Sequence, residues 1–301
     1  MQRRFALILT LLLTPVVSLN ADEPSKPPRA TPNAGPEGKR FVYKHSAGQP
    51  REMEIYFPPN HDPAKSKVPG LIMFHGGGWS GGSLSQFRTL CHYFASRGLV
   101  TATAEYRMLS KAEAKDLPQG ETRKRVCITD AKSGIRWFKQ HAGELGFDPQ
   151  RIVTGGGSAG GHVCVLATTN PGLNDPVDPK DIDTSVVAYL LFNPAFVADD
   201  NQDAEVDVLK HAQPSLPPAV VFFGTQDPWK KGWNALHSKL KGEGNKSINV
   251  QLAEGQAHGF FNRDPWQSVT LIAADRFLVQ QGLLSGEPTR AAPASGEKLV
   301  K

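Results

Sequence analysis

The stretch GGGSAGG, residues 155–161, places five glycines around a single serine, Ser158. Glycine has no side chain to pack and loses more conformational freedom on folding than any other residue. Such a cluster therefore indicates a backbone shape that other residues cannot adopt. An apolar segment, residues 152–154, precedes the cluster, and a segment of helical composition follows it. The pattern predicts a serine held on a sharp, strained turn between a strand and a helix.

Strand-like and helix-like segments alternate through residues 40–284. The expected strands are RFVYKH, EMEIYF, GLIMF, LVTATAEYR, RIVTGG, SVVAYLLFNPA, AVVFFGTQD and SINVQLAEG. The expected helices are FRTLCHYFASRG, AKSGIRWFKQHAGELG with Asp130 as its cap, AGGHVCVLATT, WNALHSKLKG and WQSVTLIAADRFLVQQG. Short apolar strands separated by helices predict an α/β fold with a mostly parallel central sheet and helices on both faces. In such sheets chemistry gathers at the carboxyl ends of the strands.

The two ends of the chain differ in composition from this block. Residues 1–21 combine a positive start, MQRR, with a short apolar run and small residues, which predicts a secretory signal peptide. We therefore expect a secreted or periplasmic protein without a stable membrane anchor. Residues 22–39 predict a disordered linker and residues 285–301 a disordered tail, because both are small and polar. Residues 40–284 are expected to form one catalytic domain.

The composition of the chain mainly excludes classes of function, namely nucleic-acid binding and metal or cofactor chemistry. The net charge of +5 falls to +3 without Arg3 and Arg4, and no basic run predicts a nucleic-acid surface. The spacing of Cys91, Cys127 and Cys164 matches no zinc or redox motif, and no other cluster has metal-ligand spacing, so we expect no metal or cofactor. Export permits one disulfide, although buried free thiols fit equally well. Oligomeric state is not predicted.

A serine hydroxyl needs a neutral imidazole to take its proton and a carboxylate to orient that imidazole. His258, in EGQAHGFF, follows a late strand and precedes a helix, as such a base should. His162 lies one helical turn after Ser158, which favours a packing or hydrogen-bonding role. Asp227, in FFGTQDPW, follows another apolar strand and a glycine turn. The chain order Ser158, Asp227, His258 is the order expected for a nucleophile-elbow hydrolase.

Two other carboxylates compete with Asp227 for the role of orienting the imidazole. Asp264 lies close after His258, and Glu254 is still on the strand that precedes His258.

One further motif would supply the remaining part of the site. The segment MFHGGGWSGG, residues 73–82, ends a strand in glycines that can turn backbone N–H groups toward developing negative charge. This predicts an oxyanion hole, to which the glycines of residues 76–78 and the Ala159 N–H at the start of the following helix can contribute. His75 is expected to order the loop, and Trp79 and Gly78 to line the substrate pocket.

The same glycines fit a competing pattern. Gly155, Gly157 and Gly160 match the dinucleotide fingerprint G-x-G-x-x-G, with Asp178 at a plausible distance beyond. That fingerprint normally follows the first strand of its sheet, whereas several strands precede this one. It also leaves Ser158 without a role, so the hydrolase interpretation is preferred.

The motifs HGGGW, EYR, GGGSAGG, GTQD and AHGF together resemble the α/β-hydrolase superfamily over about residues 40–282. The similarity is greatest to its HGGG-type esterase/lipase branch, the hormone-sensitive-lipase-like and feruloyl- or acetylxylan-esterase-like proteins. The resemblance implies Ser158 as nucleophile, His258 as base and acid, and Asp227 as the orienting residue. It also implies an oxyanion hole formed by Gly76, Gly77 and the Ala159 amide. Glu105 in EYR stands where the branch carries Asp.

The resemblance implies a serine carboxylesterase acting on short-chain or polysaccharide-linked acetyl or feruloyl esters. Residues 195–217 leave room only for a short helical insertion, so we expect little or no cap domain over the site. Two alternatives remain: a serine peptidase of the same fold, and a noncatalytic binding protein derived from it. The first usually brings extra features that this chain lacks. The second commonly loses one of the three site residues, all of which are present here.

Overall fold

The computed structural model describes residues 35–301, which include eight strands of one sheet. In chain order these are β1 (Lys39–Ser46), β2 (Gln49–Tyr56), β3 (Val68–Phe74), β4 (Val100–Ala104), β5 (Phe147–Gly157), β6 (Ala188–Phe192), β7 (Ala219–Gly224) and β8 (Ile248–Ala253). Their order across the sheet is β1-β2-β4-β3-β5-β6-β7-β8. The β1–β2 and β2–β4 pairs are antiparallel and the remaining pairs are parallel. The expected strands and the mostly parallel sheet are confirmed.

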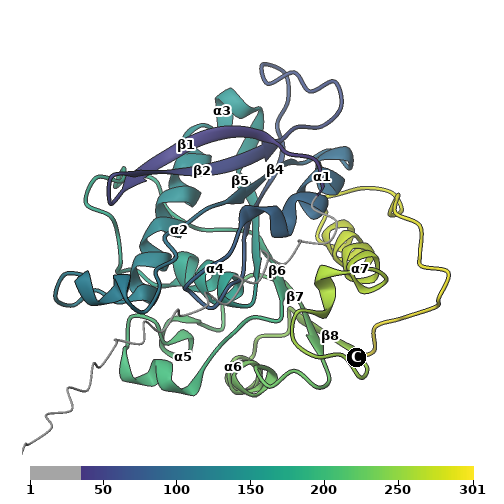
Figure 1. Cartoon of the computed structure of the whole chain (residues 1–301). Coiled ribbons are helices and arrows are strands. Elements are labelled where there is room, and N and C mark those ends of the chain that lie inside the picture. The colour runs from purple at the N-terminus through teal and green to yellow at the C-terminus, as the bar shows by residue number, and fades with distance from the viewer. Residues whose placement is uncertain (1–34) are drawn as a thin grey trace, which may run out of the picture. The chain divides into compact units, whose positions relative to one another are not determined.

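Helices cover both faces of this sheet (Figure 1). They are α1 (Arg88–Ser96), α2 (Arg123–Gln140), α3 (Ala142–Leu145), α4 (Ala159–Thr169), α5 (Val208–His211), α6 (Lys230–Gly242) and α7 (Trp266–Gln280). Short 3₁₀ turns are η1 (Leu84–Phe87), η2 (Glu113–Asp116), η3 (Ala198–Gln202) and η4 (Phe260–Asn262). Helices α1 and α7 pack on one face, and α2, α4 and α6 on the other. Within residues 35–301 no helix is both long and apolar enough to cross a bilayer.

The central strand β3 shows why the sequence forms a two-sided core. Leu71 and Met73 face the helices α1 and α7, whereas Ile72 and Phe74 face α2 and α4. All four side chains are fully buried. A strand covered on both faces is apolar at every position, which explains the continuous run LIMF. Each such side chain contributes about 1.5–3 kcal/mol through burial of apolar surface.

Helix α2 begins earlier than the sequence predicts. Its first residue is Arg123, and the Thr122 side chain caps it by accepting a hydrogen bond from the Arg125 N–H at 3.2 Å. The expectation that Asp130 is the cap is therefore wrong, because Asp130 lies inside the helix and is fully buried. In the first turn of α2, Arg125 pairs with Asp203 from the segment after β6.

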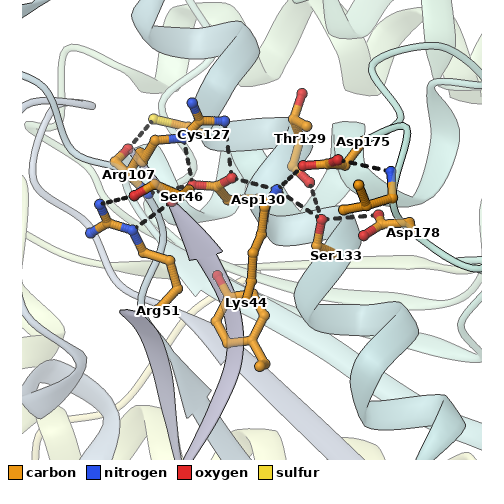
Figure 2. Close-up of polar contacts among 12 residues, drawn as sticks. Lys44, Ser46, Arg51, Arg107, Cys127, Thr129, Asp130, Ser133, Asp175 and Asp178 are labelled. Atoms are coloured by element: carbon orange, nitrogen blue, oxygen red, sulfur yellow. Dashed lines mark hydrogen bonds and ion pairs between the residues drawn. The ribbon is translucent and has the colours of Figure 1, made fainter. Parts of the chain in front are cut away.

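Asp130 belongs to a group of charged and polar side chains, here called the Lys44 cluster: Lys44, Arg107, Asp130, Ser133 and Asp175 (Figure 2). The Lys44 ammonium lies 2.9 Å from Asp130, 2.5 Å from Asp175 and 3.1 Å from the Ser133 hydroxyl. Arg107 binds both Asp130 oxygens, at 2.8 and 3.0 Å. The cluster joins β1 and the segment after β4 to α2 and the loop after α4.

Both predicted boundaries of the folded domain need correction. Residues 35–39 were expected in the linker, yet the Pro36 carbonyl accepts a hydrogen bond from Tyr56 at 3.0 Å and β1 starts at Lys39. The tail after residue 285 is not a free segment either. Val300 and Leu252 exchange backbone hydrogen bonds of 2.9 and 2.7 Å, because β8 offers an otherwise unpaired sheet edge. The predicted signal peptide and residues 22–34 lie outside the described residues.

All three cysteines are free and buried. Burial raises the pKa of Cys91, Cys127 and Cys164 well above the ordinary thiol value. The structure therefore corresponds to the free-thiol alternative, with no disulfide among these three residues.

Candidate active site

Ser158 stands on the turn between β5 and α4, at the carboxyl edge of the sheet. Its backbone has φ 51° and ψ −117°, a strained conformation for a residue with a side chain. The surroundings hold the strain in place. The Ser158 N–H donates to the Phe192 carbonyl at 2.9 Å, and the Ser158 carbonyl accepts from Gly161 and Ala195 at 3.0 and 2.9 Å. The predicted strained strand-to-helix turn is confirmed.

The glycines around Ser158 permit the close crossing of α4 over the ends of β5 and β3. A Cβ atom on Gly160 would lie 2.0 Å from the Phe74 carbonyl oxygen. One on Gly156 would lie 2.4 Å from the Gly160 carbonyl carbon. Neither contact can be relieved by a rotamer change, since both involve backbone atoms. Gly156 and Gly160 are therefore required because any side chain there would collide with backbone atoms.

Three side chains from separate loops meet at this turn. The Ser158 hydroxyl lies 2.8 Å from His258 Nε2, and His258 Nδ1 lies 2.8 Å from Asp227 Oδ2. The carboxylate can only accept, so it assigns the proton to Nδ1 and leaves Nε2 to accept from the serine. The Asp227 side chain is fully buried, whereas that of His258 is 30% exposed. This arrangement can activate a hydroxyl beside an opening to solvent.

The two competing carboxylates lie elsewhere. Asp264 accepts hydrogen bonds from the backbone and hydroxyl of Ser268 and pairs with Arg290. Glu254 is exposed on the turn after β8. The dinucleotide alternative also loses its acidic residue, since Asp178 is held by Ser133 and Arg136 in the loop after α4. The structure brings Ser158, His258 and Asp227 together as the sequence predicts.

The glycine loop after β3 lies beside Ser158, but its N–H groups are used differently from the prediction. The Gly76 N–H donates to Gln86 Oε1 at 2.6 Å and is therefore occupied. Within residues 35–301, the N–H groups of Gly77, Gly78 and Ala159 have no acceptor. Gly77 has φ 131°, and a Cβ atom there would lie 1.4 Å from the Gly81 carbonyl oxygen. The Gly76 N–H is thus not a free donor as predicted, and the free N–H groups of this loop are those of Gly77 and Gly78.

His75 orders this loop, as predicted. Its ring is buried, stacks on Tyr106 at 4.7 Å, and donates from Nδ1 to the Gly76 carbonyl at 2.8 Å. Burial lowers its pKa to about 4, so the ring is neutral near pH 7. The Tyr106 hydroxyl donates to the His75 carbonyl at 2.5 Å. This histidine therefore has a structural role in the loop.

Trp79 is turned inward and packs in the core cluster on the α2 and α4 side of the sheet. Its side chain is buried, and the indole N–H donates to His162 Nδ1 at 3.3 Å. The Lys124 ammonium lies 4.1 Å from the centre of its ring and also pairs with Asp200. These partners hold its ring against the core, and the expectation that Trp79 lines the substrate pocket stays a prediction. The predicted hydrogen-bonding role of His162 is confirmed.

A pocket of about 310 Å³ lies between the insertion after β6 and the start of α6. Its lining is mainly apolar and includes Phe196, Val208 and Trp229. The Trp229 ring also lies 6.1 Å from the His258 ring, and the backbone N–H of Trp229 donates to Asp227 Oδ1 at 2.9 Å. The pocket therefore borders the loop that carries the buried carboxylate.

The sequence interpretation missed Asn193, which lies at the end of β6. Its amide donates to Asp227 Oδ2 at 2.6 Å and accepts from the Gly259 N–H at 3.3 Å. Its φ of 47° suits asparagine better than most residues. The one available signal was its position directly after an apolar strand, at the edge where the other site residues were expected.

Known proteins resemble this chain in sequence and in fold. The BD-FAE family model matches residues 53–193. Thermogutta terrifontis esterase 2, in its apo form, is 34% identical, with a TM-score of 0.75 over 86% of this chain and 100% of that one. Its propionate-bound structure gives 34% identity and a TM-score of 0.75 over 86% of this chain and 99% of that one. Carboxylesterase NlhH of Mycobacterium tuberculosis is 25% identical over 275 residues, which cover 78% of each chain.

The TM-scores of 0.75 show that the Thermogutta esterase shares the fold of this chain. The fold, the family match and the near-complete overlap with a solved esterase all identify the same group of proteins. The chain therefore belongs to the α/β-hydrolase superfamily, in the esterase branch that includes the BD-FAE family, and it is a carboxylic ester hydrolase.

Proposed function

We propose that the chain hydrolyses esters through a Ser-His-Asp acyl-enzyme mechanism. Ser158 Oγ attacks the ester carbonyl while His258 Nε2 takes the hydroxyl proton. Asp227 holds the imidazole in the required tautomer and stabilises the imidazolium that forms. The two 2.8 Å contacts of His258 are the observation that supports this proposal most directly.

The tetrahedral intermediate carries its charge on the former carbonyl oxygen. The N–H groups of Gly77, Gly78 and Ala159 are the donors available to receive it, and the N-terminus of α4 favours negative charge at the same point. Each such donor contributes about 3 kcal/mol to stabilising the transition state. His258 then protonates the leaving alcohol. Water, deprotonated by His258, attacks the acyl-enzyme and releases the carboxylic acid and Ser158.

The proposed substrates are short-chain esters, or acetyl and feruloyl esters carried on polysaccharides. The insertion after β6 contains only η3 and α5, so little covers the site. The Thermogutta esterase was solved with propionate bound, which supports a short acyl group. An open site also suits an ester attached to a bulky polymer. A long acyl chain would gain little from so small a covering segment.

We also propose that the protein is exported and that residues 1–21 are removed. The support is the pattern of the N-terminal sequence, which lies outside the described residues. N-terminal sequencing of the protein recovered from the medium or periplasm of the source organism tests this. A mature protein that begins at Met1 would contradict it.

A fluorophosphonate probe tests the mechanism. The probe should label the wild type and fail to label Ser158→Ala, whose ester hydrolysis should also be lost. Labelling of Ser158→Ala would contradict the assignment of the nucleophile.

A panel of p-nitrophenyl acetate, butyrate and palmitate, acetylated xylan and feruloyl esters tests the substrate class. A preference for palmitate would contradict the proposed short-chain or polysaccharide-linked esters. Turnover of p-nitroanilides above that of esters would favour a peptidase.

A further inference from the structure

One side chain joins the glycine loop after β3 to the loop that carries His258. Gln86, in η1, accepts a hydrogen bond from the Gly76 N–H at 2.6 Å through Oε1. Its Nε2 donates to Asn262 Oδ1 at 2.9 Å. Gln86 and Asn262 are 176 residues apart in sequence, so the contact exists only in the folded chain.

Asn262, in η4, continues this connection toward the histidine. Its Nδ2 donates to the Gly259 carbonyl at 2.9 Å, and its backbone N–H donates to the same oxygen at 3.1 Å. Gly259 directly follows His258, and its own N–H donates to Asn193, which binds Asp227. Hydrogen bonds therefore connect the glycine loop to Gly259, the residue after His258, and through Asn193 to Asp227.

The chemistry of the two amides fixes their orientation. Asn262 must present its NH₂ group to the Gly259 carbonyl, so its oxygen faces Gln86. Gln86 must then present its NH₂ group to Asn262 and its oxygen to the Gly76 N–H. An ionised carboxylate at position 86 could accept from the Gly76 N–H but could not donate to Asn262. An apolar side chain there could form neither hydrogen bond. Beside the amides, Phe87 and Phe261 stack at 6.1 Å and add an apolar contact between the same segments.

We propose that Gln86, acting with Asn262, is a positioning residue that sets the placement of the oxyanion donors relative to His258. The inference rests on the proposed mechanism. During the reaction one carbonyl must meet both the N–H groups of Gly77 and Gly78 and the hydroxyl activated by His258. Those groups come from two loops, and preorganisation requires both to be fixed before the substrate binds.

The test compares Gln86→Met with wild type, because methionine keeps the length of the side chain and removes both hydrogen bonds. With p-nitrophenyl acetate, kcat should fall by about 10- to 100-fold and KM should change little, since the loss concerns the transition state. The affinity for a trifluoromethyl ketone, which forms a tetrahedral adduct with the serine, should fall by a similar factor. Unchanged kcat and unchanged ketone affinity in folded Gln86→Met would overturn the inference.

Gln86→Glu gives a second readout that a purely structural role would not produce. When protonated, glutamate can accept from Gly76 and donate to Asn262, as glutamine does. When ionised, it cannot donate, and its charge opposes the oxyanion. The ratio of its kcat to that of wild type should therefore rise as pH falls from 8 to 5, provided both proteins remain folded. A flat ratio would count against the inference.

The matched control is Thr168→Val, which removes a half-buried hydrogen bond of 2.7 Å to Tyr189. Thr168 lies ten residues along α4 from Ser158, about 15 Å at helical rise. It should lose stability without a change in kcat. If Gln86→Met does not fold, Asn262→Asp replaces it, because aspartate keeps the acceptor for Gln86 and loses the donor to Gly259.

The activity of Ser158→Ala tests the proposed mechanism independently of the Gln86 variants. An inactive Ser158→Ala together with normal Gln86→Met kinetics would overturn only the positioning role. An active Ser158→Ala would overturn the mechanism itself.

Discussion

The Ser158–His258–Asp227 group and the Lys44 cluster are both built around a buried carboxylate that accepts several hydrogen bonds. Asp227 accepts from His258, Asn193 and the Trp229 N–H. Asp130 accepts from Lys44 and from the side chain and backbone of Arg107 (Figure 2). The two groups differ in whether their hydrogen bonds lead to a side chain that solvent can reach.

The chain of hydrogen bonds from Asp227 ends at a partly exposed imidazole and a hydroxyl on strained backbone. The Lys44 cluster is closed, since Lys44 is only 7% exposed and lies between two carboxylates. A closed cluster compensates buried charge and fixes segments to one another. An open one keeps a reactive atom beside solvent. A high density of buried charge therefore does not by itself identify a site of chemistry.

The largest expected effect separates the two groups through activity. Asp227→Asn should keep the fold and reduce kcat by about 10⁴-fold, because the amide favours the wrong histidine tautomer. Steady-state kinetics with p-nitrophenyl acetate and a thermal melt measure the two quantities. Turnover near that of wild type would mean that another acid orients His258.

In the Lys44 cluster we expect a loss of stability with little change in kcat. Asp130→Ala leaves the buried charges of Lys44 and Arg107 undercompensated and should lower the free energy of unfolding by about 3–5 kcal/mol. Urea unfolding measures the loss, and kcat of the folded fraction should remain close to wild type. A drop in kcat comparable with that of Asp227→Asn would remove the distinction drawn between the two groups.

His75 allows the comparison to be extended to pH. Its pKa of about 4 in the folded state lies below the ordinary value, so between pH 6.5 and 4 only the unfolded chain binds this proton. Stability should therefore fall as pH drops through that window, by about 3 kcal/mol in total, and be unaffected above it.

Urea unfolding at pH 7 and pH 4.5 should show a smaller loss for His75→Gln than for wild type. His237, whose pKa burial also lowers, is common to both proteins and cancels in the difference. Equal losses would show that His75 is protonated without penalty in the folded loop.

The smallest effect is expected at Asn193. Asn193→Gly keeps the backbone at φ 47° and removes the amide that supports Asp227. It should reduce kcat by about tenfold, the equivalent of one hydrogen bond to a charged group worth about 1.5 kcal/mol. Asn193→Ala adds backbone strain and should lose more stability than Asn193→Gly with a similar loss of kcat. A loss as large as that of Asp227→Asn would assign the amide a greater part in orienting His258.

Much of the fold and the centre of the site could be predicted from the sequence. The strand order along the chain, the turn at Ser158, and the identities of His258 and Asp227 depend on local patterns. Apolar runs mark covered strands, and glycines mark the close crossing of α4 over β3. The predicted boundaries were less successful, because the backbone of Val300, near the end of the tail, pairs with Leu252 of β8 without any side-chain pattern to indicate it.

The sequence by itself determined which residues can supply the hydroxyl, the imidazole and the carboxylate, because strained turns and buried strands restrict composition locally. Only the tertiary structure decided how the remaining polar groups pair. It placed Gln86 on the Gly76 N–H, Asn193 on Asp227, and Asp130 between Lys44 and Arg107. A hydrogen-bond donor accepts any suitable partner within reach, so its choice depends on which distant segments the folded sheet brings together.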